Sequence, residues 1–331
     1  MSRLFTVNNN AFKLTTKYYQ MKLHVKIPLI IVALFAVSTG LKAQNKAKMS
    51  AADSLLNAMN SGDKPNGPVV IAKSTRLVLS QTTETIKQGN LNFQVIHRFG
   101  DIAGANGGPQ TDFGIDRVND VYIGFEYGIT DNFQIDFGRS TIGQMLQWEL
   151  KYALLHQTAD DSSPVAISVL GQYAIRPYQS FPTFDSRVSY LGQAVFARKF
   201  SKDFNFQISP TIVMDNTPYP NLPGSEKSFF ALQAAARVAI NRHMGFILDY
   251  AHSFSTFRSN NSSFQDPIGL GYEVETGGHV FTLNITNANA VNEINYLSNT
   301  QNNISKGQYR LGFTISRMFD LRPKPKDMDK K

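Results

Sequence analysis

Apolar and polar residues alternate along most of the chain after residue 89, which is the pattern of β-strands with one apolar face. The clearest example is the segment 119–139, where two alternating runs flank a polar turn at 129–132. The apolar members of these runs are Val121, Ile123, Phe125, Tyr127, Phe133, Ile135 and Phe137. Glu126 and Asp136 fall on the opposite face, so the segment predicts an antiparallel hairpin. Alternation within one hairpin fits a soluble sandwich and a transmembrane barrel equally well.

The connections between such runs separate the two architectures. Twelve alternating runs are predicted at 91–99, 121–127, 133–137, 146–154, 165–173, 188–200, 204–214, 229–240, 244–255, 268–275, 279–287 and 308–319. Short connections at 129–132, 157–163, 201–203, 241–243 and 276–278 alternate with moderate or long ones, as short periplasmic turns and long external loops do in outer-membrane barrels. We therefore predict an all-β fold, an antiparallel transmembrane barrel of about twelve strands with both ends in the periplasm. A soluble lipocalin-like barrel, the main alternative, has about eight strands and a polar exterior.

Residues 21–43 predict a secretory signal peptide. Lys22 and Lys26 precede the apolar stretch Ile27–Val37, and Leu41-Lys42-Ala43 resembles a cleavage site. Eleven apolar residues are too few to cross about 30 Å of hydrocarbon, which argues against a helical anchor. Residues 1–20 have no signal character, and we expect them to be a non-native extension before a start at Met21.

Charge and cysteine content limit the possible partners. The chain has a formal net charge of +8, but residues 1–43 hold six basic and no acidic residues, which leaves 27 basic against 25 acidic residues in 44–331. That balance does not predict a nucleic-acid partner. There is no cysteine, and hence no disulfide framework and no lipid-modified cysteine.

Two segments flank the predicted barrel, which spans 89–319. Residues 44–88 are expected to form a periplasmic segment that is partly helical or acts as a plug, with a short helix after Ser50 and a strand at Arg76–Leu79. The segment Arg76–Thr82 is a candidate to pair at the barrel seam, which would change the strand count. The polar, proline-interrupted tail 320–331 is expected to be a disordered periplasmic extension.

If the apolar face meets lipid, the charged residues on the other face line the lumen. These candidate lumen-lining residues are Arg98, Glu126, Asp136, Glu149, Lys151, Arg237, Asp249, Glu273, Glu275 and Arg310. A selective pore usually carries one dominant sign, whereas this set has six acids and four bases. Two alternatives remain open: a paired network that fills a narrow barrel, and a channel for small polar solutes.

The sequence predicts no catalytic residue, metal site or cofactor. A lipase-like site on the barrel wall would need Ser, His and an orienting Asn or Asp to converge. His252 has Tyr250 and Phe254 as neighbours on its face, and His156 has Thr158 two residues away. The histidines do not show the spacing of metal ligands. We therefore expect that the protein is not an enzyme.

Two stretches carry a family resemblance. Gly89-Asn-Leu-Asn-Phe-Gln-Val-Ile-His-Arg-Phe-Gly100, and Phe113-Gly-Ile-Asp116 followed by the Tyr-Gly-Ile-Thr-Asp hairpin, resemble an uncharacterised outer-membrane β-barrel family of Bacteroidota. The similarity runs from about Thr75 to Phe319. It implies a barrel in the outer membrane of a Gram-negative bacterium, and it carries no assigned activity or site residue.

Two functions are compatible with these observations. The first is a narrow channel for small polar solutes, and the second is a non-conducting structural or surface-interaction barrel that acts through its external loops. The expected partners are outer-membrane lipid and the barrel-insertion machinery, with a small polar solute for the channel. Phe319, an aromatic residue near the end of the last strand, is the candidate insertion signal, although twelve residues follow it.

Overall fold

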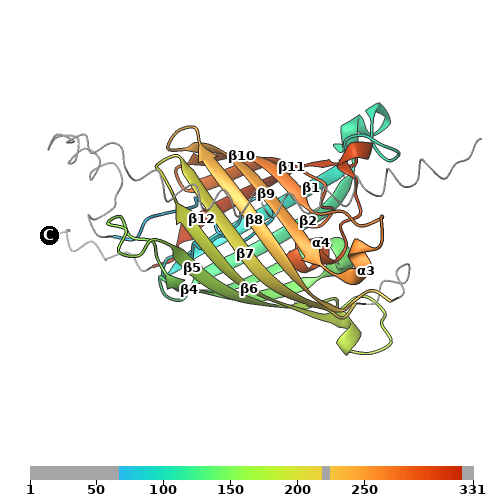
Figure 1. Ribbon diagram of the computed structural model, residues 1–331, viewed down its shortest axis with the longest axis horizontal. Coiled ribbons are helices and arrows are strands. Elements are labelled where there is room, and N and C mark those ends of the chain that lie inside the picture. The colour runs from blue at the N-terminus through green and yellow to red at the C-terminus, as the bar shows by residue number, and fades with distance from the viewer. Residues whose placement is uncertain (1–66, 218–223, 323–331) are drawn as a thin grey trace, which may run out of the picture. The chain divides into compact units, whose positions relative to one another are not determined.

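The computed structural model describes residues 67–217 and 224–322, and these form a closed barrel of twelve antiparallel strands (Figure 1). Each strand pairs with its sequence neighbours, and β1 pairs with β12 to close the barrel. The strands are β1 (Asn90–Asp101), β2 (Val118–Gly128), β3 (Phe133–Ser140), β4 (Leu146–Leu155), β5 (Ala166–Ile175), β6 (Val188–Lys199), β7 (Phe204–Asp215), β8 (Ser228–Ala239), β9 (Met244–Phe254), β10 (Ile268–Thr276), β11 (His279–Thr286) and β12 (Arg310–Asp320). The predicted fold and strand number are confirmed. The predicted signal peptide, the helix after Ser50 and most of the C-terminal tail lie outside the described residues.

The long connections gather at one end of the barrel. Figure 1 shows α3 and α4 at this end, and the short turns lie at the other. The helices are η2 (Pro109–Gly114), η3 (Ile142–Gln144), η4 (Asp185–Arg187), α3 (Thr256–Ser259), α4 (Glu293–Ser298) and η5 (Ile304–Lys306). Within the described ranges no helix is long and apolar enough to cross a membrane. By the rule for outer-membrane barrels, the end with the short turns is periplasmic and the end with the long loops is external.

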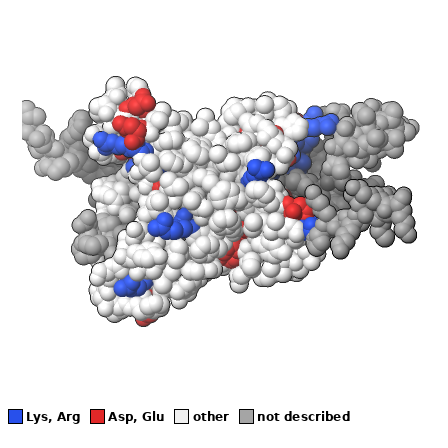
Figure 2. Space-filling model, turned by 180° about the vertical axis from the view of Figure 1, so that it is seen from behind, with Lys and Arg blue, Asp and Glu red and all other residues white. Residues whose placement is uncertain are grey.

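The outer wall is apolar. Figure 2 shows one face on which charged side chains are few and scattered. Large hydrophobic side chains in the strands point outward, among them Phe125, Leu150 and Leu270. Toward the external end, Phe137, Trp148, Tyr173 and Tyr190 of four consecutive strands form a row with neighbouring ring centroids 5.3–5.7 Å apart. Such a row is typical of the aromatic girdle at a membrane interface.

Inside the barrel, Tyr122 lies against two glycines. Gly124 on β2 and Gly138 on β3 are paired across the two strands, and the ring of Tyr122 lies against both. A Cβ atom at Gly138 would lie only 2.1 Å from Tyr122 Oη and 2.3 Å from its Cζ. The two glycines are therefore needed to give the tyrosine ring room beside the wall.

We expect the substitution Gly138→Ala to destabilise the barrel by about 1–3 kcal/mol, because the added methyl group overpacks the ring of Tyr122. The matched control is Gly171→Ala on β5, where an added Cβ meets nothing within 4 Å. The measurement is the urea midpoint of folding into lipid vesicles for both variants. Equal midpoints would show that Tyr122 moves aside without cost.

Residues 68–88, here called the plug, occupy the interior of the barrel. The plug enters at the periplasmic end, where Val69 N donates to Gln157 O at 2.7 Å and Pro68 forms a bridge with Thr158. It reverses direction in a tight turn, in which Leu77 N donates to Ser80 O at 2.9 Å. It returns to the periplasmic end, where Gln88 forms a bridge with Gly128. Both limbs of the plug therefore connect to the rest of the chain at the same end of the barrel.

The segment Arg76–Leu79 does not form the strand that the sequence predicts. It lies in the turn of the plug, with one isolated bridge between Arg76 and Gln81. It does not pair at the barrel seam, because β1 and β12 pair with each other there. A tight turn inside the barrel is favoured because Leu77, Val78 and Leu79 can all be buried there, whereas alternate residues of a wall strand face lipid.

A second segment folds inward from the external end. Residues 287–300, here called the inward loop, carry α4, and nearly all of their side chains are buried. Asn292 caps this helix by accepting hydrogen bonds from Ile294 N at 2.9 Å and Asn295 N at 3.4 Å. The plug and the inward loop thus enter the barrel from opposite ends.

Candidate functional site: the barrel lumen and its outer pocket

Nine of the ten predicted lumen-lining residues are buried inside the barrel. They are Arg98, Glu126, Asp136, Glu149, Lys151, Arg237, Asp249, Glu273 and Arg310. Glu275 differs, because it lies next to the end of β10 with its side chain 32% exposed and forms an ion pair with Lys73 at 2.8 Å. Alternation places these side chains inside, and the plug and inward loop decide what they contact.

Asp249 and Glu126 are two of the wall carboxylates that contact the plug directly. Asp249 Oδ2 accepts hydrogen bonds from Leu79 N at 2.8 Å, Ser80 N at 2.9 Å and Ser80 Oγ at 3.0 Å. The two carboxylate oxygens of Glu126 lie 2.9 and 2.7 Å from Thr75 Oγ1. Hydrogen bonds to an ionised acceptor are stronger than those between neutral groups. These carboxylates therefore anchor the plug to β9 and β2.

Arg98 on β1 joins both inserted segments. Its Nη2 donates to Val78 O in the plug at 3.0 Å, and its Nε donates to Ala290 O in the inward loop at 3.2 Å. Two other wall bases form buried ion pairs, Arg237 with Glu273 at 2.7 Å and Arg310 with Asp101 at 2.9 Å. The predicted charges are thus largely engaged with one another or with the inserted segments.

A second group of carboxylates lies around Gln172 on β5. The Nε2 atom of Gln172 is 2.7 Å from Glu149 Oε2 and 2.7 Å from Glu293 Oε2. Glu149 belongs to the wall and Glu293 to α4, so the amide links the wall to the inward loop. Gln81 of the plug also donates to Glu149, at 3.2 Å. Plug, wall and inward loop therefore meet through one set of polar side chains.

An apolar core crosses the lumen beside these polar groups. Leu77, Val78 and Leu79 of the plug belong to the same buried cluster as Ile294 and Tyr296 of the inward loop. The wall contributes inward-facing apolar residues to this cluster, including Met145, Leu170, Val213, Phe229 and Ile247. The wall members of this cluster lie on β5 to β9 and just before β4, and they pack against the plug and the inward loop, so side chains rather than water fill this part of the interior.

The hydroxyl of Tyr296 reinforces the contact between the inward loop and the plug. It lies 3.1 Å from Leu79 O and 2.8 Å from Gln233 Oε1 on β8. Burial raises the pKa of this hydroxyl well above its ordinary value, so the group stays protonated and acts as a donor. A hydroxyl has one proton, so it donates to one of these two acceptors at a time.

Val78 is held in a notch formed by two glycines of β10. A Cβ atom at Gly269 would lie 2.5 Å from Val78 Cγ1, and one at Gly271 would lie 2.6 Å from Val78 Cγ2. As long as Val78 is in place, any larger residue at either position would collide with its methyl groups. The wall is therefore shaped to accept this side chain.

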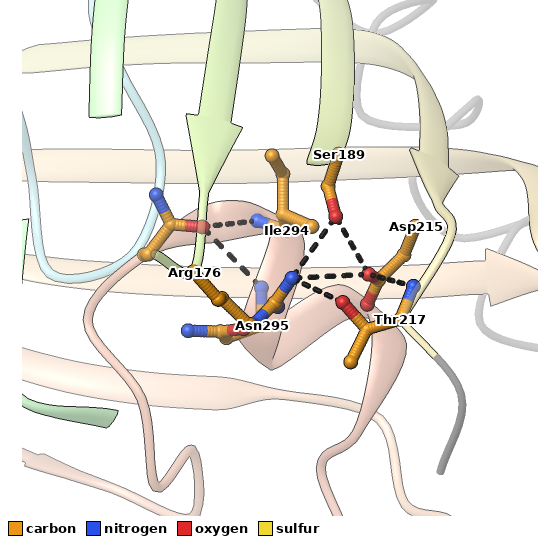
Figure 3. Close-up of polar contacts among 7 residues, drawn as sticks. Arg176, Ser189, Asp215, Thr217, Ile294 and Asn295 are labelled. Atoms are coloured by element: carbon orange, nitrogen blue, oxygen red, sulfur yellow. Dashed lines mark hydrogen bonds and ion pairs between the residues drawn. The ribbon is translucent and has the colours of Figure 1, made fainter. Parts of the chain in front are cut away.

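A pocket of about 430 Å³ opens at the external end, among the loops that follow β3, β5, β7 and β11. Its described lining includes Arg176, Phe181, Asn289, Asn295 and Asn299. Figure 3 shows Arg176 pointing toward Ser189, Asp215, Thr217 and Asn295. The volume lies in the range of small-molecule sites, of about 300–1,000 Å³.

Arg176 organises the wall of this pocket. Its Nη1 atom lies 3.0 Å from Ser189 Oγ and 3.5 Å from Asp215 Oδ1, and it also donates to Thr217 Oγ1. Its Nη2 atom donates to Asn295 Oδ1 at 2.6 Å (Figure 3). The guanidinium therefore connects β5 and β7 with α4.

Several residues of this site were not singled out from the sequence. One of them is Arg76, whose Nη1 donates to Leu79 O within the plug at 3.3 Å. Arg76, Arg176 and Glu293 lie outside the alternating runs, so the strand pattern does not indicate where their side chains point. The inward orientation of the buried wall glutamines could have been predicted from the sequence, because they occupy the same alternate strand positions as the charged residues. They are Gln94, Gln134, Gln147, Gln172, Gln193, Gln207 and Gln233.

The histidines acquire partners that the sequence did not indicate. His252 Nδ1 lies 2.9 Å from Asp266 Oδ1, and Tyr250 donates to the same carboxylate. His156 Nε2 lies 2.9 Å from Asn132 Oδ1. A His–Asp pair or a His–Asn pair orients an imidazole, but nucleophilic catalysis needs a third, attacking group.

Comparison with solved structures finds barrels of similar architecture and low sequence identity. The NanC porin is 12% identical, with a TM-score of 0.43, over 69% of this chain and 98% of that one. The KdgM porin is 5% identical, with a TM-score of 0.40, over 70% and 99%. Omp33 of Acinetobacter baumannii is 9% identical, with a TM-score of 0.37, over 70% and 100%. No curated protein matches the chain.

A family model gives a more direct assignment. The model described as "Membrane bound beta barrel domain (DUF5777)" matches residues 73–319, which is most of the chain. The matched region includes all but the first residues of the plug, together with the wall and the inward loop. The closed barrel, its apolar exterior and this match agree with one another, and the protein is an outer-membrane β-barrel that belongs to the DUF5777 family.

Proposed function

We propose that this porin-like barrel is closed at rest, and that it acts through its external face or opens only when the plug is displaced. The observation that carries this proposal is the apolar core formed by Leu79, Tyr296 and the inner wall. A permanently open channel for polar solutes keeps a hydrated path along its lumen. Here that path is occupied by packed side chains, which favours the non-conducting alternative for the resting state.

The course of the plug supports a gated form of this function. Both of its limbs connect at the periplasmic end, near Gln157 and Gly128. A hairpin-shaped segment with this topology can be withdrawn toward the periplasm without threading its end through the barrel. The residues then exposed would be amides and charges of both signs, a lining suited to small polar solutes.

We infer that the protein is not an enzyme. Many polar groups of the lumen bind the plug, the inward loop or one another, and the oriented imidazoles of His156 and His252 are hydrogen-bonded to Asn132 and Asp266. The signal peptide at 21–43, an origin in Bacteroidota and recognition of Phe319 by the barrel-insertion machinery stay predictions. Phe319 pairs with Leu91, where the first and last strands close the barrel.

Single-channel recording tests the proposal. We expect the refolded full-length chain, inserted in planar lipid bilayers, to show no steady stepwise conductance at moderate voltage. Folding of the same sample would be checked by the different gel migration of boiled and unboiled protein. A folded barrel that conducts steadily in its unmodified form would contradict the closed state.

A further inference from the structure

The outer pocket has the chemistry of a binding site for an uncharged ligand. Arg176 is the one ionisable side chain among its described lining residues, and it lies beside the carboxylate of Asp215. Both side chains are almost fully buried, so the two charges offset each other within the wall. The remaining polar lining is neutral: Gln179, Ser180, Thr217, Asn289, Asn295 and Asn299.

The amide of Asn295 has a defined orientation. Its Oδ1 atom accepts a hydrogen bond from Arg176 Nη2, and the flipped amide would place two donors against each other. Its Nδ2 atom is buried and has no hydrogen-bond partner, and the residue as a whole is only 6% exposed. A buried donor without an acceptor is costly, and Asn295 lines the pocket, so a ligand oxygen placed beside this nitrogen would remove that cost.

Phe181 adds an apolar surface to this polar lining. A ligand that complements the pocket must present hydroxyl or carbonyl oxygens to the amides and an apolar face to the aromatic ring. A sugar ring has both features: its hydroxyl groups donate and accept hydrogen bonds, as amides do, and its C–H groups can cover an aromatic face. A charged sugar would meet no unpaired opposite charge in the described wall.

From this geometry we infer that the outer pocket binds an uncharged carbohydrate from the external medium, with Phe181 beneath the sugar ring and Asn295 donating to one of its oxygens. The inference concerns the external face and does not depend on whether the lumen conducts. If the barrel conducts steadily, the carbohydrate site is still expected. If no carbohydrate binds, the closed state of the lumen is not contradicted.

The test uses the refolded full chain in a detergent without a sugar headgroup, applied to a glycan array of uncharged and acidic oligosaccharides. The affinities of bound glycans are then measured by calorimetry. We expect binding to uncharged glycans. We expect Phe181→Ala to weaken it at least about tenfold, which corresponds to about 1.4 kcal/mol. Asn295→Asp, which keeps the shape but replaces the donor by an acceptor, is expected to have a similar effect.

Phe184→Ala is the matched control, because Phe184 lies on the same loop, is 65% exposed and is not part of the pocket lining. It should bind as the unmodified chain does. The inference is overturned if no glycan binds, if binding is confined to acidic glycans, or if Phe181→Ala and Phe184→Ala bind equally well. Boiled and unboiled gel migration of each variant shows that lost binding is not lost folding.

Discussion

The substitution Asp249→Ala is expected to make the non-conducting barrel open intermittently in planar bilayers. The carboxylate of Asp249 receives three hydrogen bonds from Leu79 and Ser80 at the turn of the plug. A hydrogen bond to a charged group contributes about 1.5–3 kcal/mol, so the loss of even one should raise the population of the displaced plug about tenfold or more. The readout is the open probability per inserted barrel.

A disulfide lock provides the control for this variant. A Cβ atom at Gly269 would lie 3.3 Å from Val78 Cβ, close to the separation of about 3.5–4.5 Å in disulfides. The chain contains no cysteine, so Val78→Cys with Gly269→Cys introduces a single pair. In the Asp249→Ala variant, oxidation of this cysteine pair should abolish the conductance, and a reductant should restore it. If oxidation leaves the openings unchanged, the plug is not the gate.

The substitution Phe125→Arg should destabilise the membrane-inserted barrel by about 2–4 kcal/mol, because it places a charge in the hydrocarbon near the middle of β2. Phe125 points outward and is 42% exposed. Its neighbour Glu126 points inward and binds the plug, so the two positions test opposite faces of one strand. The measurement is the urea dependence of folding into vesicles, followed by the emission of Trp148 on the lipid-facing wall.

Val118→Arg is the matched control for this substitution. Val118 is 63% exposed and begins β2 at the external end, where an arginine should cost about 0–1 kcal/mol. If both variants fold with the same midpoint, Phe125 does not lie within the hydrocarbon layer. If Val118→Arg is the more damaging of the two, the assigned membrane position is wrong.

The strand pattern predicted the fold and much of the lumen from local information. Successive side chains of a strand point to opposite faces, so one alternating run specifies which residues face inward wherever that strand lies in the barrel. This is why Glu126, Glu149 and Asp249 could be placed inside. Glu275 departs from the set because it lies beside Thr276, the last residue of β10, where the interior meets solvent.

The contents of the lumen could not be predicted in the same way. The contact between Leu79 and Asp249 joins residues 170 positions apart, and the link from Tyr296 to Leu79 spans 217 positions. No periodicity marks such contacts, because they depend on the complete barrel rather than on one strand. The same holds for Arg176, Asp215 and Asn295, which come together from three separate elements.

The sequence by itself thus determined the barrel, its strand number, the lipid-facing and inward-facing positions and the end that carries the long loops. The physical reason is that the two-residue period of strands and the lengths of turns are local properties repeated along the chain. Only the tertiary structure decided that residues 68–88 and 287–300 fill the interior and that a pocket forms above them. Closing the barrel brings distant segments into one enclosed space, and their packing against one another determines whether that space is open or closed.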